Sequence, residues 1–199
     1  MNLSEFADVV ASSRSYRRFD ESRPVSRELL EELVACARLA PTGNNTQLLR
    51  FHLSCERDEV LEVFSHHRWA ALLRDWDGPA PGERPTAYVT VCGPAGSRAS
   101  AIRNQDAGIA AQTLALAARA SGLVGCMIAS FDAALADALG LAEKNLEPLV
   151  LLALGYPAAD ERVVVEPADT PHGLSYWRER EGDAWVHHVP KLGVEDLLA

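Results

Sequence analysis

Apolar residues recur at helical spacing in several parts of the chain, which predicts amphipathic helices. Ser4 and Ser26 are in position to cap the N-termini of the first two, and Gly122 is a natural C-terminal cap for the longest. That longest helix is packed with Ala and Leu, so we expect it at the centre of the molecule or of a dimer. The predicted helices are Leu3–Ala11, Val25–Ala40, Asp58–Phe64, Ala101–Ser121 and Ala133–Leu139, with a helical turn over Val194–Leu198.

Extended segments lie between the helices. Leu48–Cys55 alternates apolar and polar residues, and Thr86–Cys92 is rich in β-branched and aromatic residues, so both predict strands. Because helices and strands mix without a regular βαβ alternation, the pattern favours an α+β fold over a doubly wound sheet. His66–Pro85 is rich in Trp, Gly and Pro, which is typical of a loop or lid. Further strands are predicted over Leu123–Ile128, Glu147–Tyr156 and Trp185–Lys191.

The composition is that of an ordinary globular protein. The chain has 199 residues, of which 48% are hydrophobic and 24% charged, so it is long enough to bury a core and shows no sign of disorder or of a fibrous repeat. No stretch has the composition of a linker. We expect one domain over residues 1–199.

The formal net charge of −9 bears on partners and location. A negative chain repels nucleic acid and anionic lipid, and its arginines form no basic stripe, so we expect neither a nucleic-acid nor a membrane partner. Glu5 and Asp8 stand where a secretory signal would be basic and then apolar. Charge-free stretches such as 107–118 fall well short of the roughly 20 residues that span a bilayer. A cytoplasmic location is expected.

Cys36, Cys55, Cys92 and Cys126 lie far apart in the sequence. They show neither CxxC spacing nor a neighbouring pair of histidines suited to zinc. We therefore interpret all four as small buried hydrophobic residues in a reducing compartment, and we assign no metal to the protein.

Candidate chemistry begins at Arg14–Arg18, with the sequence RSYRR. Two or three guanidinium groups with a hydroxyl between them can form charge-assisted, bidentate bonds to a phosphate. Near the other end of the chain, Lys191 could complete such a phosphate site. The alternatives are a solvated basic turn and a solvated lysine.

Two turns also have the features of a ligand site. In Ala40–Gln47 (APTGNNTQ), Gly and Asn permit unusual backbone angles, and the Asn and Gln amides both donate and accept hydrogen bonds. An ordinary helix-to-strand turn is the alternative there. In Gly122–Asp132 (GLVGCMIASFD), small side chains let backbone N–H groups approach a planar ligand. The glycines do not match the G-x-G-x-x-G fingerprint, which disfavours a Rossmann NAD site.

These segments occur in the same order in the nitroreductase-like flavoproteins, and the chain resembles that family over nearly its whole length. Asp106–Gln112 resembles the family's D-x-x-x-A-x-Q helix, and Leu152–Pro157 (LALGYP) also takes part in the resemblance. The resemblance implies a nitroreductase-like α+β fold, with helices flanking a central, mainly antiparallel sheet. It also implies an intertwined homodimer with two interfacial flavins and a C-terminal arm that reaches across to the partner.

By the same resemblance, FMN is the cofactor and NAD(P)H the reductant. Arg14, Ser15 and Lys191 would contact the FMN phosphate, and Arg17 would lie nearer the ribityl chain or the N1–O2 edge of the ring. Asn45 and Gln47 would come from the other subunit, and the backbone after the third predicted strand would lie beside flavin N5. The expected cofactor contacts are Arg14, Ser15, Arg17, Thr42, Asn45, Gln47, Ala129, Ser130 and Lys191.

The implied activity is ping-pong hydride transfer from NAD(P)H, by way of FMN, to a nitroaromatic, quinone or similar small conjugated acceptor. Because the flavin carries the chemistry, no side chain is assigned a catalytic role. A flavin-fragmenting or reductive dehalogenating member of the family is one alternative, although 66–85 is short for the lid of such an enzyme. A flavin-binding or storage protein with little turnover is another.

Three positions depart from the family pattern. Leu48-Leu49 stands in place of Pro-Trp, Leu192 in place of a second basic residue, and Ala129 in place of a bulky or acidic residue. The first two weaken the expected grip on phosphate, and the third leaves the substrate class open.

Overall fold

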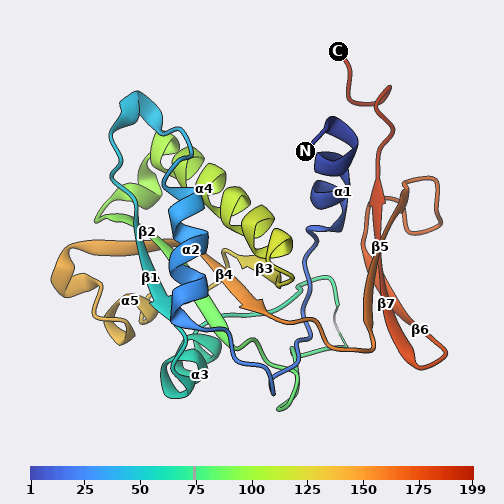
Figure 1. Ribbon diagram of the computed structural model, residues 1–199, viewed down its shortest axis with the longest axis horizontal. Helices are drawn as coiled ribbons and strands as arrows, with labels where there is room; N and C mark the ends of the chain where they lie inside the picture. Colours follow the sequence, from blue (N-terminus) through green and yellow to red (C-terminus); the bar gives the residue numbers. More distant parts are fainter. Residues whose placement is uncertain (74) are drawn as a thin grey trace.

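The computed structural model describes residues 1–73 and 75–199 and confirms a mixture of helices and strands (Figure 1). Its helices are α1 Leu3–Ser12, α2 Arg27–Ala37, α3 Arg57–Ser65, α4 Ala101–Ala120 and α5 Leu135–Ala138, with short 3₁₀ turns η1 Gly43–Asn45, η2 Ser97–Ala99 and η3 Ala142–Lys144. Its strands are β1 Arg50–Ser54, β2 Ala87–Pro94, β3 Val124–Ile128, β4 Leu146–Gly155, β5 Glu161–Pro167, β6 Trp177–Glu181 and β7 Ala184–Lys191. The predicted elements are present, with ends shifted by a few residues, except for the helical turn at the C-terminus.

The main sheet has the strand order β1-β2-β4-β3, and every neighbouring pair in it is antiparallel. Its central strands β2 and β4 bury most of their side chains on both faces, because helices cover the sheet from both sides (Figure 1). α2 and α4 pack on one face through Leu33 and Leu114, and α3 and α5 cover the other through Val63 and Leu135. The predicted antiparallel sheet flanked by helices is therefore confirmed.

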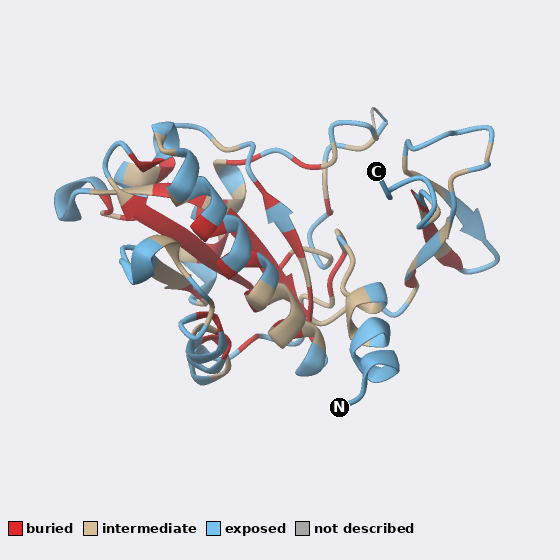
Figure 2. Ribbon diagram, turned by 90° about the horizontal axis from the view of Figure 1, so that it is seen from above, coloured by how far each residue is buried: buried red, intermediate tan, exposed pale blue. Residues whose placement is uncertain are grey.

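The C-terminal part of the chain forms a second sheet with the order β5-β7-β6. β5 runs parallel to β7, and β6 runs antiparallel to it. This sheet stands apart from the main one, on the far side of α1 (Figure 2). Of its strands the sequence predicted only β7, because β6 is mostly charged and β5 has only three valines between charged residues.

The longest helix, α4, buries one face and leaves the opposite face open. Its buried residues include Ala107, Ala110 and Leu114, whereas Ile102 is 38% exposed and Ile109 is 41% exposed. The helix therefore lies at the edge of this chain's core. Within the described parts of the chain, no helix is long and apolar enough to cross a membrane.

The helix ends correct one prediction and confirm another. α1 begins after Asn2, whose side chain accepts from the N–H of Glu5 while the Glu5 carboxylate accepts from the N–H of Asn2. Ser4 lies inside the helix, so its prediction as the N-cap was wrong. In a capping box the N-cap residue stands three positions before the acidic residue, and Asn2 stands three positions before Glu5. Ser26 caps α2 as predicted, by accepting from the N–H of Leu29.

The C-terminal helical turn predicted over Val194–Leu198 is also wrong. The segment makes two overlapping hydrogen-bonded turns but no helix: the N–H of Asp196 donates to the carbonyl of Gly193 at 3.3 Å, and the N–H of Leu197 donates to the carbonyl of Val194 at 3.1 Å. Leu197 and Leu198 are largely exposed, so no apolar face is available to stabilise a helix there.

The cysteines differ in burial. Cys92 and Cys126 are buried as predicted, but Cys36 is exposed and Cys55 is half-buried. The prediction of a buried Cys36 was wrong because α2 buries the face formed by Leu30, Leu33 and Ala37, and Cys36 lies off that face. All four thiols are free.

The segment 66–85 is irregular as predicted, but it is anchored to the core at its start. Trp69 is only 8% exposed, and His67 Nε2 lies 2.8 Å from the hydroxyl of the buried Tyr88. Burial lowers the pKa of His67 to about 4. Arg74, which falls within this predicted loop, lies outside the described residues.

Candidate functional site

A cavity of about 310 Å³ lies between the polar segment after α1, the end of α4, the edge strand β3 and the strand β7. It brings together Arg14, Ser15 and Arg17 from the start of the chain with Lys191 from its end. Their sequence motifs are separated by nearly the whole chain, so this meeting is a result of tertiary structure. We call this space the cation cavity.

The edge of the main sheet holds Ser15 at the cavity. Ser15 forms a bridge with Gly125 of β3, and the N–H of Tyr16 donates to the carbonyl of Gly125 at 3.0 Å. A Cβ atom at Gly125 would lie 2.8 Å from the carbonyl oxygen of Ala153 on the neighbouring strand. Glycine at this position therefore lets the sheet and the RSYRR segment approach each other closely.

The positive side chains of the cavity are held by uncharged groups. Arg14 donates from Nε to the carbonyl of Ser13 at 2.9 Å and from Nη2 to the carbonyl of Val10 at 3.1 Å. Arg17 lies over the ring of Tyr176, with its Cζ 4.7 Å from the ring centroid. Among the described residues, no carboxylate lies within 4.0 Å of the charged nitrogens of Arg14, Arg17 or Lys191. These charges are therefore available to an anion.

Sequence reasoning did not assign other polar residues of the cavity, among them Gln112, Arg119 and Tyr176. Gln112 and Arg119 reach it from α4, and Tyr176 reaches it from the segment before β6. Gln112 belongs to the D-x-x-x-A-x-Q stretch, which was a usable signal. Arg119 lies in a helix packed with Ala and Leu whose pattern marks no clear polar face, so only the fold shows which way it faces.

Arg18, the last residue of the RSYRR segment, points away from the cavity. Its side chain is 8% exposed and pairs with Glu83 at 2.5 Å, Asp160 at 3.0 Å and Glu161 at 3.6 Å. The hydrogen bond to Glu83 is the main cause that raises the pKa of Arg18. Arg18 thus links the start of the chain to the start of β5, and its role is structural.

A buried carboxyl lies behind the cavity. Glu161 accepts from the N–H of Arg17 at 3.2 Å, and its other oxygen lies 3.6 Å from Arg18 Nη1. Burial raises the pKa of Glu161 to about 7, against the opposing effect of the hydrogen bond and the nearby arginines. The neighbouring His187 is also buried, which lowers its pKa to about 4. This arrangement fixes the backbone at Arg17.

Thr42, Asn45 and Gln47 lie elsewhere in this chain. Thr42 and Gln47 line a separate cavity of about 180 Å³, and Asn45 is exposed beside it. Their loop lies at one end of the molecule, whereas β7 and Lys191 lie at the other (Figure 1). One chain therefore does not unite the two halves of the predicted contact set.

The 42–47 loop has a defined conformation. Asn44, Asn45 and Gln47 all have positive φ angles near 50°, and the N–H of Gly43 donates to Oδ1 of Asp106 at 2.8 Å. Asp106 is 2% exposed and pairs with Arg103 at 2.7 Å. The first residue of the D-x-x-x-A-x-Q stretch therefore holds the loop, which presents Asn45 and Gln47 to the outside.

Ala129 and Ser130 follow β3 and are both exposed. Ala129 is in phase with Gly125 and Met127, the β3 residues that line the cavity on the open face. The carbonyl of Ser130 accepts from the N–H of Arg68 at 3.1 Å. The anchored part of 66–85 thus lies beside the predicted N5 segment, although neither Ala129 nor Ser130 itself lines the cavity.

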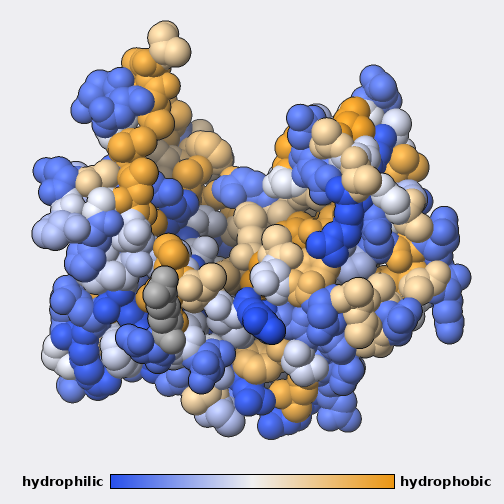
Figure 3. Space-filling model, turned by 180° about the vertical axis from the view of Figure 1, so that it is seen from behind, coloured by the Kyte–Doolittle hydropathy of each residue, from blue (hydrophilic) through white to orange (hydrophobic). Residues whose placement is uncertain are grey.

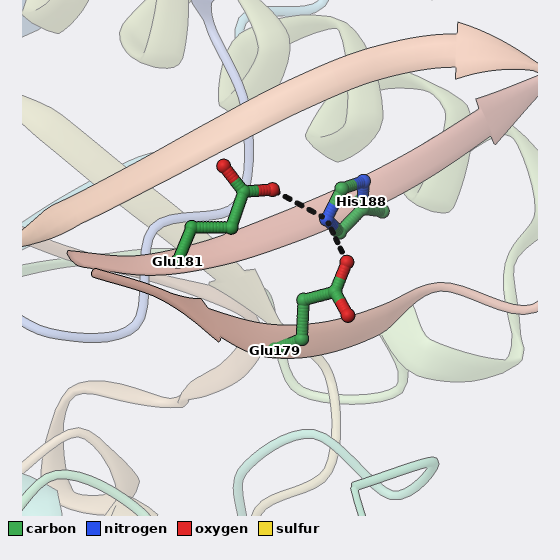
Figure 4. A group of neighbouring side chains, drawn as sticks. All are labelled: Glu179, Glu181 and His188. Carbon is green, nitrogen blue, oxygen red and sulfur yellow. Dashed lines mark ion pairs between the residues drawn. The ribbon is translucent and has the colours of Figure 1, made fainter. Parts of the chain in front are cut away.

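A separate polar group strengthens the sheet that carries Lys191. His188 Nε2 lies 3.3 Å from Glu179 and 3.7 Å from Glu181, and its Nδ1 lies 3.0 Å from Glu166 (Figure 4). The ring of Trp177 stacks on the imidazole with a centroid distance of 4.7 Å. The group connects β5, β6 and β7, and the carboxylates of Glu179 and Glu181 remain more than half exposed. We interpret it as an ion-pair network.

Comparisons with known proteins agree with this fold. The family model described as Nitroreductase family matches residues 10–156. A 4-nitrobenzoate reductase of Pseudomonas putida is 45% identical over 49 residues, which is 25% of this chain. That match spans about a fifth of the relative's length, 21%.

Solved structures extend the likeness to most of the chain. A nitroreductase family protein from Clostridium difficile 630 has a TM-score of 0.59 and 25% identity, and the match covers 79% of this chain and 86% of that one. A protein from Desulfovibrio desulfuricans, solved in complex with FMN, has a TM-score of 0.63 and 25% identity, over 79% of this chain and 88% of that one. The chain thus belongs to the Nitroreductase family and is an oxidoreductase of that family.

Proposed function

We propose that this protein is an FMN-dependent NAD(P)H oxidoreductase that reduces nitroaromatic, quinone or similar small conjugated acceptors. The observation that carries the proposal is the cation cavity, where Arg14, Ser15, Arg17 and Lys191 meet from opposite ends of the chain. The relative from Desulfovibrio desulfuricans that was solved with FMN supports the identity of the cofactor.

The residues present fit a phosphate-bearing cofactor. Guanidinium groups form strong, directional bonds to phosphate oxygens, and the Ser15 hydroxyl adds a further donor. Arg17 Nε is buried and, among the described residues, has no hydrogen-bond partner, which is costly unless a ligand supplies one. Arg14, Ser15 and Lys191 would hold the phosphate end, and Arg17 would face the ribityl chain or the ring.

FMN, when bound, supplies the hydride chemistry between the nicotinamide and the acceptor. The protein's own part is to bind, to orient and to provide charge. Arg17 would supply a positive charge beside the ring system, whose reduced form carries negative charge. Ala129, a small exposed residue after β3, leaves room for a flat acceptor. No side chain is required as a nucleophile or a general acid.

The site is completed, in this proposal, by a second copy of the chain. Asn45 and Gln47 are exposed and far from the cation cavity, so a partner's loop would supply them. Apolar side chains gather on the projection where α1 and the C-terminal tail lie, beside a deep notch (Figure 3). Exposed apolar residues of this kind favour association. On α1 and the tail they are Leu3, Phe6, Leu192, Val194, Leu197 and Leu198, and α4 adds the exposed Ile102 and Ile109.

The first-choice acceptor is a nitroaromatic compound. The name of the Pseudomonas putida relative, 4-nitrobenzoate reductase, supports this choice, although that protein matches only 49 residues of this chain. Flavin fragmentation or reductive dehalogenation would call for a substrate enclosed by a lid, whereas the start of 66–85 is fixed by His67 and Trp69.

The test is the redox cycle of the bound flavin. Purified protein loaded with FMN is mixed anaerobically with NADH or NADPH, and the flavin absorbance is followed. We expect bleaching, followed by recovery of the absorbance when 4-nitrobenzoate or a quinone is added. Bound flavin that is not bleached would indicate a storage protein, and protein that binds no FMN would refute the proposal.

A further inference from the structure

Arg119 is a fourth cation in the cavity, and no sequence motif marks it. It lies in the last turn of α4 and lines the same space as Arg14, Arg17 and Lys191. The carbonyl end of a helix carries partial negative charge, so a cation is stabilised there. Arg119 thus brings a positive charge to the cavity from the end of α4, without a carboxylate partner among the described residues.

The guanidinium of Arg119 is held by one nitrogen only. Its Nε donates to Ser12 Oγ at 3.0 Å, and the Ser12 hydroxyl in turn donates to the carbonyl of Asp8 at 2.7 Å. Among the residues that the structure describes, neither terminal nitrogen of Arg119 has a hydrogen-bond or ion-pair partner. Arg14, in contrast, already uses two of its nitrogens on backbone carbonyls. Arg119 therefore keeps both terminal nitrogens for a ligand in the cavity.

Four positive side chains in one cavity repel one another unless an anion joins them. A phosphate monoester carries close to two negative charges and three acceptor oxygens at neutral pH, which suits several cations better than a single carboxylate does. The paired terminal nitrogens of a guanidinium match two of those oxygens. The free terminal nitrogens of Arg119 thus have the donor pattern that suits a phosphate.

We propose that Arg119 binds the phosphate monoester of the flavin and makes the site select FMN over riboflavin, which lacks the phosphate. The proposal rests on the proposed function, because it takes FMN as the ligand of the cation cavity. Ser12 acts as a positioning residue that orients the guanidinium.

The experiment compares two flavins on one protein. FMN-free protein is titrated with FMN and with riboflavin, and binding is followed by quenching of flavin fluorescence. We expect Arg119→Met to weaken FMN binding about 10- to 100-fold, as for the loss of a charge-assisted hydrogen bond, and to leave riboflavin binding within about twofold. Arg119→Lys keeps the positive charge but loses the paired guanidinium nitrogens. Its FMN affinity should therefore lie between those of the unsubstituted protein and Arg119→Met.

The matched control is Arg57→Met. Arg57 is 79% exposed on α3 and outside the cation cavity, so this variant makes the same change in net charge at another place. We expect it to bind both flavins as the unsubstituted protein does. Circular dichroism and thermal unfolding establish that each variant is folded. If Arg119→Met does not fold, Ser12→Ala takes its place, with a smaller loss of FMN affinity expected and riboflavin binding unchanged.

The outcomes separate the two proposals. FMN affinity that is unchanged in Arg119→Met, or a loss that is equal for FMN and riboflavin, overturns the role of Arg119 while the proposed function stands. Unsubstituted protein that binds neither flavin overturns both.

Discussion

Arg17 and Arg18 are neighbours in the sequence, but their guanidinium groups have different environments. Arg17 lies over Tyr176 beside the cation cavity, whereas Arg18 is buried among Glu83, Asp160 and Glu161. The acids around Arg18 neutralise it, so it is not available to a ligand. A basic cluster in the sequence thus contains both structural and ligand-facing cations, and only their partners tell them apart.

The phosphate assignment predicts the effect of removing two cations. Arg14→Ala combined with Lys191→Ala removes two charge-assisted contacts, so we expect FMN affinity to fall by at least about 100-fold. Fluorescence titration measures it. The charge-matched control is Arg57→Ala with Lys144→Ala, outside the cavity. Equal FMN affinity in the two double variants would contradict the assignment.

His67 predicts how stability depends on pH. Its pKa is lowered to about 4 by burial, so between pH 6.5 and 4 the unfolded chain binds a proton that the folded chain does not. Stability from this group is therefore fully present above pH 6.5 and is lost as the pH falls toward 4, by up to about 3 kcal/mol. We expect denaturant unfolding at pH 7 and pH 5 to show a smaller pH effect in His67→Asn than in the unsubstituted protein.

Comparing the stability change between pH 7 and pH 5 in the variant and in the unsubstituted protein removes the contributions of other groups. His187 acts in the same direction as His67, whereas Glu161, whose pKa is raised to about 7, acts in the opposite direction. Both remain in the variant. An unchanged pH effect in His67→Asn would show that His67 titrates alike in the folded and unfolded chain.

At the scale of elements, α4 links the two parts of the predicted site. Asp106, on its first half, holds the 42–47 loop through Gly43, while Gln112 and Arg119 on its second half line the cation cavity. A Cβ atom at Gly43 would meet the end of the Ile102 side chain, which would have to move aside, so the loop packs closely on the helix. The helix acts as the common support of both sites.

Replacing Asp106 tests this support. Asp106→Ala leaves Arg103 without its partner and the N–H of Gly43 without an acceptor, so we expect a loss of roughly 2–4 kcal/mol in unfolding free energy. Urea unfolding measures it. Arg103→Ala in the same background should add little, because the pair is already broken. Full additivity would mean that the two residues do not act together.

At the scale of the molecule, the described chain has two sheets, and it does not bring all the proposed FMN contacts together. The cation cavity uses both ends of the chain, and the exposed loop with Asn45 and Gln47 lies away from it. A symmetric dimer would bring the loop of each copy to the cation cavity of the other. It would also cover the exposed apolar surface of both copies.

Mixed dimers test whether the site is shared. One subunit carries Arg14→Ala and Lys191→Ala, and the other carries Asn45→Ala and Gln47→Ala. In a mixed dimer with shared sites, one site has all its defects and the other has none, so about one FMN per two chains should bind with full affinity. The subunits are co-expressed with different tags, purified through both, and titrated with FMN.

The two parent variants are the controls, and neither should bind FMN with full affinity alone. If both halves of the site belonged to the same chain, every site in the mixed dimer would keep a defect. No full-affinity binding would then be seen. Sedimentation at the mass of a single chain would exclude the dimer directly.

Local pattern was enough for most of the elements. The spacing of apolar residues predicted α2 and β1, and residue composition predicted α4 and β2, because elements that pack on a core need apolar residues at their buried positions. It failed at β5 and β6, whose exposed, charged residues bury little. It also failed for Cys36, because composition alone does not tell which face of α2 is covered.

For the candidate site too, some features followed from the sequence and others only from the structure. The sequence by itself named Arg14, Ser15, Arg17 and Lys191, since phosphate chemistry limits the useful residue types and family order marks their positions. Only the tertiary structure decided that these four share a cavity, that Arg18 leaves it and that Arg119 enters it. The reason is physical: a side chain's availability depends on the partners that folding brings to it, and those partners lie far away in the sequence.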